Sequence, residues 1–187
     1  MEAMDLTNQF LIAMPSLNDP NFSRTVTYLC SHDEEGAMGL VINRPLDMEL
    51  GVVLERMGMA INEAEAADIP VLRGGPVMPE RGFVLHRPPG SWDAVLEVKG
   101  SDIAVATSRD ILDAIANGNG PEDVLVTLGY AGWGAGQLEQ ELQQNAWLSG
   151  PADQRILFEA PFEDRWESAA RLLGVDLERL SGQAGHA

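Results

Sequence analysis

Four glycines stand within eight residues, at positions 129, 132, 134 and 136. The apolar run 124–128 precedes them, and Leu138 and Leu142 follow at the fourfold spacing of a helix. The pattern predicts a strand, a glycine turn and a helix. Because glycine suits a positive φ or a very close backbone approach, we expect this turn to pack tightly or to present bare amides.

The glycine stretch does not complete a phosphate-binding motif. The dinucleotide fingerprint needs a third glycine where Glu139 stands, and a P-loop needs a lysine where Gln137 stands. Glu139 and Glu141 would also repel an anion at the helix N-terminus. Tight backbone packing therefore explains these glycines better than ligand binding does.

Length and charge narrow the class of protein. The 187 residues fit a single domain over 1–187. No apolar run approaches the roughly 20 residues of a membrane-spanning helix, and the N-terminus lacks a secretory signal pattern, so we expect a cytoplasmic protein. Twelve Lys and Arg against 29 Asp and Glu give a net charge of −17. Direct nucleic-acid binding depends on cationic neutralisation of phosphates, and this balance disfavours it.

Short apolar segments alternate with turn residues along most of the chain. Strands are predicted at 9–14, 25–32, 38–43, 70–77, 81–86, 94–98, 103–106, 124–128 and 156–158. Helices are predicted at 50–57, 137–146 and 166–173. A further helix is predicted between an N-cap at Thr107, with Asp110 as its partner, and a stop at Gly118. Residues 62–68 fit either a helical turn or an exposed connection, and 149–151 act as a breaker.

The order of these elements indicates the fold class. Several hairpins come before most of the helices, and the regular alternation of a doubly wound sheet is absent. We expect an α+β domain with a strongly bent, mostly antiparallel sheet that helices cover.

Cys30 and His32 invite a nucleophile hypothesis, because alternation would place them on one strand face with Val26 and Tyr28. Side chains two residues apart lie about 6.5–7 Å apart along a strand, too far for a thiol–imidazole hydrogen bond of about 3 Å. Cys30 fits a small core residue better. As the only cysteine, it also excludes an intramolecular disulfide and any two-cysteine metal site.

Metal-capable groups cluster at residues 32–35, and His86 lies on another predicted strand. The chain has three histidines, one of them His186, and no His-Glu-x-x-His helix. An acidic, exposed hairpin tip is the better interpretation, and we predict neither a metal site nor a cofactor. Trp133, within the glycine stretch, would anchor a partner if its ring were exposed.

Several long strings resemble the AlgH family, also called YqgE. They are residues 10–22, residues 24–45, Gly74-Gly-Pro-Val77, residues 81–86, the glycine stretch through Trp147 and the terminal residues 185–187. The resemblance covers nearly the whole chain. It implies a single-domain α+β fold with a bifurcated sheet that includes a small barrel, surrounded by helices. It also implies a bacterial cytosolic protein described as a transcriptional regulator, with no agreed reaction, ligand or catalytic residue.

Three functional hypotheses follow. The first is a non-enzymatic regulatory or adaptor protein that acts through a protein partner or a small ligand. The candidate binding residues are Arg24, His32, Asn43, Arg44, Gly74, Gly75, His86, Tyr130, Trp133 and Asn145. A structural role is the alternative for each: the two arginines would pair with acids, and Asn43 would cap a turn.

The second hypothesis is a hydrolase or a nucleotide-handling enzyme that uses His32 or His86 as a base. It requires an imidazole and a carboxylate or thiol to converge in one pocket. The third hypothesis, direct DNA binding, is disfavoured by the net charge of −17.

Overall fold

The computed structural model describes residues 4–184. Residues 1–3 and 185–187, which include His186 and the last string of the family resemblance, lie outside the described residues. The strands are β1 (Gln9–Ala13), β2 (Val26–Asp33), β3 (Gly36–Val41), β4 (Pro45–Glu49), β5 (Pro70–Arg73), β6 (Val77–Arg87), β7 (Val95–Glu97), β8 (Ala104–Ala106), β9 (Asp123–Gly134) and β10 (Trp147–Pro151). The helices are α1 (Leu50–Arg56), α2 (Ala64–Ala67), α3 (Arg109–Ala116), α4 (Gln137–Gln143), α5 (Gln154–Phe158), α6 (Arg165–Leu172) and α7 (Leu177–Ala184), with a 3₁₀ turn at Phe162–Asp164.

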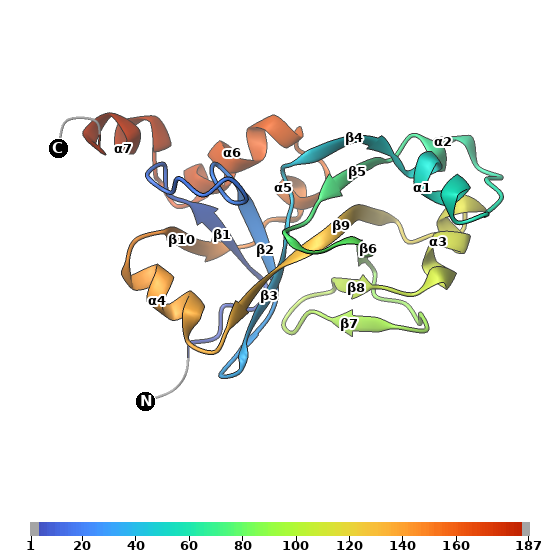
Figure 1. Ribbon diagram of the computed structural model, residues 1–187, viewed down its shortest axis with the longest axis horizontal. Helices are drawn as coiled ribbons and strands as arrows, with labels where there is room; N and C mark the ends of the chain where they lie inside the picture. The colour runs from blue at the N-terminus through green and yellow to red at the C-terminus, as the bar shows by residue number, and fades with distance from the viewer. Residues whose placement is uncertain (1–3, 185–187) are drawn as a thin grey trace.

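The strands form one curled sheet with helices around it (Figure 1). Its order is β10-β1-β2-β3-β9-β6-β8-β7, and β5 joins the middle of the sheet through β9 while β4 pairs with β5. Every pairing is antiparallel except the one between β5 and β9. The predicted α+β fold with a bent, mostly antiparallel sheet is confirmed, and the sheet curls into a half-barrel.

The sheet forks along β9. One edge of β9 pairs with β6, whereas its other edge pairs first with β5 at residues 126–128 and then with β3 at residues 131–134. Gly74 lies at the junction, because its N–H donates to the Leu128 carbonyl and its own carbonyl accepts from Val41 N, both at 2.8 Å. This branch point is the bifurcation that the family resemblance implied.

The fork depends on glycine at three positions where two backbones cross. A Cβ atom on Gly129 would collide with the Gly75 carbonyl oxygen, and one on Gly75 would collide with the Tyr130 carbonyl group. A Cβ atom on Gly74 would collide with the Gly129 carbonyl oxygen. Gly129 also has φ +79°, a region that L side chains rarely adopt. The prediction of close backbone packing is confirmed at Gly129, whereas a Cβ atom on Gly134 or Gly136 would meet no backbone.

The predicted turn at 129–136 is wrong in extent. Residues 129–134 continue β9, and the turn before α4 contains only Ala135 and Gly136, with Gly136 at φ +75°. The strand extends this far because its first half pairs with β6 and β5 and its last four residues pair with β3, which the local sequence does not reveal.

Further segments differ from the sequence prediction, and β4 and α7 were not predicted. Residues 154–158 form α5 rather than a strand, because the Asp153 carboxylate caps the helix by accepting from Ile156 N at 3.0 Å. The predicted breaker at 149–151 belongs to β10, which pairs with β1. Smaller corrections concern the N-cap of α3, which is Ser108 instead of Thr107, and residues 62–68, which contain the short α2.

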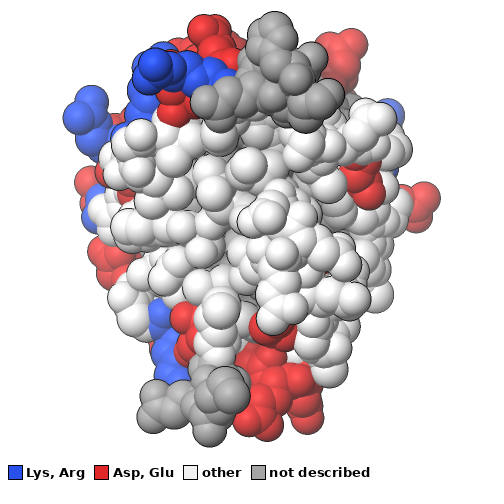
Figure 2. Space-filling model, turned by 90° about the vertical axis from the view of Figure 1, so that its left-hand side faces the viewer, with Lys and Arg blue, Asp and Glu red and all other residues white. Residues whose placement is uncertain are grey.

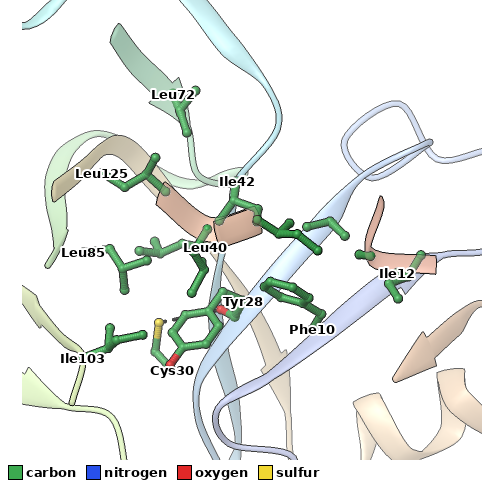
Figure 3. Packing of buried hydrophobic residues seen from close by; sticks show 14 of the residues in the cluster. Phe10, Ile12, Tyr28, Cys30, Leu40, Ile42, Leu72, Leu85, Ile103 and Leu125 are labelled. Atoms are coloured by element: carbon green, nitrogen blue, oxygen red, sulfur yellow. Dashed lines mark hydrogen bonds between the residues drawn. The ribbon is translucent and has the colours of Figure 1, made fainter. Parts of the chain in front are cut away.

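Three apolar clusters hold the elements together. The cluster between the sheet and helices α5–α7 contains Tyr28, Cys30, Leu40 and Leu85, all almost fully buried (Figure 3). A second cluster packs α1, α2 and α3 against β5, β6 and β9, and a third packs α4 against β1, β2 and β9. No helix in the described part of the chain has both the length and the apolar character to cross a membrane.

Substitution of Gly129 tests the importance of the glycine crossing, and the same substitution at Gly136 is the matched control. Gly129→Ala should lower the free energy of unfolding by at least about 3 kcal/mol, because it combines a positive φ with a backbone collision. Gly136→Ala has nearly the same φ but open space around it, so it should cost only about 1 kcal/mol. Urea unfolding followed by circular dichroism measures both, and equal losses would contradict the crossing as the source of the difference.

Candidate functional site

A groove of about 1050 Å³ lies on the concave side of the curled sheet. The turn between β2 and β3 forms one wall, the β7–β8 hairpin forms the other, and β6 with β9 forms the floor. The floor is apolar: the rings of Phe83 and Tyr130 meet edge to face at 5.5 Å, and Met38, Val77 and Val105 surround them. A concave apolar surface of this size is typical of a binding site.

Large apolar side chains remain exposed at the margin of the groove. Met78 is 53% exposed, Leu96 44% and Val95 38%. A folded protein exposes single apolar residues routinely, but three beside one groove indicate a contact surface.

The charges along the groove are mostly negative. Asp33, Glu35 and Asp93 line it together with a single cation, Arg81. Within residues 4–184, none of the three carboxylates has a Lys, Arg or His nitrogen within 4 Å. The Arg81 guanidinium lies 5.9 Å from the centre of the Phe83 ring. The groove therefore presents an apolar floor with a net negative rim.

Of the predicted site residues, Tyr130 lies in the groove and Trp133 borders it. The Trp133 ring is only 6% exposed, which is less than an anchor for a partner requires. Its Nε1–H donates to Glu141 at 3.0 Å, and Trp147 donates to the same carboxylate oxygen at 2.9 Å. Trp133 thus belongs to the core under α4, and Gly74 and Gly75 support Tyr130 from the backbone crossing without lining the groove.

His32 faces away from Cys30, contrary to simple alternation. The register of β2 shifts between Leu29 and Ser31, so Ser31 turns to the groove and His32 turns to α4. His32 Nδ1 accepts a hydrogen bond from the Leu6 amide at 3.0 Å, and Nε2 contacts the Glu139 carboxylate. Since Nδ1 is the acceptor, Nε2 carries the proton that Glu139 accepts, and both nitrogens are occupied.

His86 is completely buried in β6. Its Nδ1 lies 3.0 Å from the Val84 carbonyl oxygen and its Nε2 lies 2.8 Å from the Pro89 carbonyl oxygen. The ring also meets Trp92 edge to face at 6.3 Å. Neither His32 nor His86 lines the groove, so the groove does not bring together the imidazole and carboxylate that the enzyme hypothesis requires.

Cys30 is 1% exposed and packs in the main cluster, as predicted for a core residue. Burial raises the pKa of its thiol, which keeps it protonated at neutral pH. In the part of the chain that the structure describes, no group of three or more His, Cys, Asp or Glu side chains is placed to hold a metal ion.

The remaining candidate residues hold loops in place. Asn43 accepts from Val26 N and donates to the Arg24 carbonyl, both at 3.0 Å. Arg44 binds three carbonyls of the loop at residues 20–23 at 2.7–2.8 Å, so it pairs with backbone rather than with an acid. The Arg24 guanidinium stacks 4.7 Å from the Trp166 ring, and Asn145 takes φ +60° just after α4.

Figure 2 shows that the end of the molecule formed by α4 and β10 is largely uncharged, with charges near its margins. Glu139 and Glu141 of α4 hydrogen-bond to His32 and to the two indole N–H groups. The groove remains the candidate site.

Sequence reasoning missed most of the groove. The sequence places Val95 and Leu96 within the predicted strand 94–98, and it places Met78 and Asp93 outside the predicted strands. Arg81 and Phe83 lie in a string that supported the family resemblance, which is the one signal that pointed here. Apolar residues in a short predicted strand normally indicate a core, so their exposure follows only from the position of β7 at the sheet edge.

A forked half-barrel surrounded by helices, with an open groove on its concave side, defines the class of fold. The sequence model of family DUF179, described as AlgH-like, matches residues 10–178. A UPF0301 protein of Thioalkalivibrio sulfidiphilus is 60% identical over 98% of this chain and 97% of the relative. A UPF0301 protein of Xanthomonas campestris is 54% identical over 97% of this chain and 96% of the relative. The chain belongs to the AlgH family.

Two solved structures share the fold. The solution structure of the AlgH protein from Pseudomonas aeruginosa matches with a TM-score of 0.81 and 53% identity, over 100% of this chain and 98% of that one. A crystal structure of a protein from Corynebacterium diphtheriae matches with a TM-score of 0.72 and 21% identity, over 97% of this chain and 94% of that one. The names of these relatives state no reaction or ligand.

The burial and protonation of the Cys30 thiol can be tested by how fast it reacts. Native protein at pH 7 should react with the thiol reagent DTNB only as fast as it unfolds, because the thiol is buried and protonated. Leu96→Cys adds a thiol at a position that is 44% exposed, and this second thiol should react at once. Immediate labelling of the unsubstituted protein would contradict the core assignment and restore a nucleophile hypothesis.

Proposed function

We propose that this protein is a non-enzymatic regulatory or adaptor protein that binds a partner protein in the groove. The observation that carries the proposal is the apolar floor at Phe83 and Tyr130 beside the exposed Met78, Val95 and Leu96. Such a surface gains free energy when a partner removes it from water, at roughly 25 cal/mol per Å² of apolar area.

The placement of the reactive side chains favours binding over catalysis. The imidazoles of His32 and His86 hydrogen-bond within the protein, and the Cys30 thiol is buried. The charged groups that line the groove are three carboxylates and one guanidinium, which suit recognition and steering of a charged partner.

Regulation of transcription would then proceed through a protein partner rather than through DNA. A net charge of −17 and an acidic groove oppose contact with phosphates. A cytoplasmic location suits this role and a free cysteine.

A matched pair of substitutions tests the proposal. Val95 in the groove and Val52 on α1 are both 38% exposed, so Val95→Asp and Val52→Asp make the same chemical change at equal exposure. In affinity capture from bacterial lysate with quantitative mass spectrometry, the partner should stay with wild type and Val52→Asp. Its recovery should fall roughly tenfold with Val95→Asp, because a charge would enter an apolar contact.

Both variants should keep the wild-type unfolding midpoint within the range of ordinary surface substitutions. A set of captured proteins that does not change with Val95→Asp would contradict a partner site in the groove.

A further inference from the structure

The outer edge of β7 is an unoccupied side of the sheet. β7 ends the strand order and, among the described residues, pairs only with β8. Thr107 N donates to the Ala94 carbonyl at 3.0 Å and Val98 N donates to the Ile103 carbonyl at 2.9 Å. In an antiparallel ladder, positions that hydrogen-bond to the neighbouring strand alternate with positions that do not, so the N–H and C=O groups of Leu96 also face β8. The N–H and C=O groups of Val95 and Glu97 therefore face outward.

The side chains of β7 leave both of its faces apolar and accessible. Val95 and Leu96 are consecutive, so they point to opposite sides of the strand, and both remain well exposed. An edge strand with free backbone groups and apolar side chains is a template for another strand. Addition of an extended peptide at such an edge is an established mode of recognition.

The carboxylates define the chemistry of the added segment. Asp93 precedes β7, and Asp33 and Glu35 stand on the opposite wall. Three carboxylates against Arg81 give this part of the groove a net negative charge, which a cationic segment would complement. In a strand, alternate side chains lie on opposite faces, so one set would meet the apolar floor and the other the acidic rim.

We propose that the groove binds an extended segment of a partner protein in which apolar residues alternate with Lys or Arg, and that this segment adds as a strand to the outer edge of β7. The inference rests on the proposed function and specifies the chemistry of the partner. Backbone hydrogen bonds to Val95 and Glu97 supply the pairing, apolar side chains cover the floor, and the cations approach Asp33, Glu35 and Asp93.

Labelled peptides test the chemistry by fluorescence anisotropy with the full chain. The probes are (Val-Lys)4, its acidic counterpart (Val-Glu)4 and (Gly-Lys)4, which keeps the charge without apolar side chains. (Val-Lys)4 should bind roughly tenfold more tightly than either of the others, because only it satisfies both the rim and the floor.

Two charge-matched variants separate the local effect from the net charge. The triple variant Asp33→Asn, Glu35→Gln and Asp93→Asn should bind (Val-Lys)4 roughly tenfold more weakly. The control variant removes the same number of negative charges at residues that do not line the groove, on α1, on α2 and next to α2, by Glu55→Gln, Glu65→Gln and Asp68→Asn. It should bind (Val-Lys)4 as tightly as the wild type does. Equal losses in both variants would overturn recognition at the rim, and so would equal binding of (Val-Glu)4.

Amide hydrogen exchange, resolved by NMR, tests the strand addition. Saturating (Val-Lys)4 should slow exchange of the Val95 and Glu97 amides roughly tenfold or more, since they gain partners. Unchanged exchange at both amides would overturn pairing at β7. If the peptide and exchange tests fail but capture of a partner is still lost in Val95→Asp, the strand-addition proposal is wrong and the proposed function stands. If capture does not change in Val95→Asp, both the strand-addition proposal and the proposed function are wrong.

Discussion

The backbones of Gly74 and Gly75 pass so close to those of Gly129 and Tyr130 that no side chain fits between them. This contact lets one edge of β9 change partner from β5 to β3, while Gly74 hydrogen-bonds to both sides of the junction. The fork directs β3 and the β2–β3 turn away from β5, so the sheet curls (Figure 1). The groove lies between that turn and the β7–β8 hairpin. The concave site is therefore a consequence of where two backbones cross.

Most side chains that suggest chemistry in the sequence serve the structure instead. Glu139 binds His32, Glu141 accepts from two tryptophans, and Arg44 binds three loop carbonyls. These groups fix α4 and the loop at residues 20–23 on the sheet, which leaves the groove lined by apolar residues, carboxylates and Arg81. The separation of these structural groups from the groove supports a surface that recognises a partner through shape, burial and charge.

The fold class and the close packing at Gly129 followed from the sequence, because glycine and turn chemistry act locally. Contacts between residues that lie far apart in the sequence determine the features that the sequence did not predict. Pairing with β3 extends β9 through Gly134, the Asp153 cap makes 154–158 a helix, and a bulge after Leu29 turns His32 to the opposite face. The groove escaped prediction for the same reason: whether Val95 is buried or exposed depends on β7 being the last strand of the sheet.

If the glycine crossing fixes the position of both walls, the groove is open before any partner arrives. Spin labels on cysteines placed at Glu34, in the β2–β3 turn, and at Glu97, at the end of β7, span the two walls. Because Cys30 is buried, it should remain unlabelled. Pulsed electron paramagnetic resonance should give one narrow distance distribution that a saturating (Val-Lys)4 peptide leaves in place. A broad or two-peaked distribution in the free protein would show that the walls move, and would contradict a preformed groove.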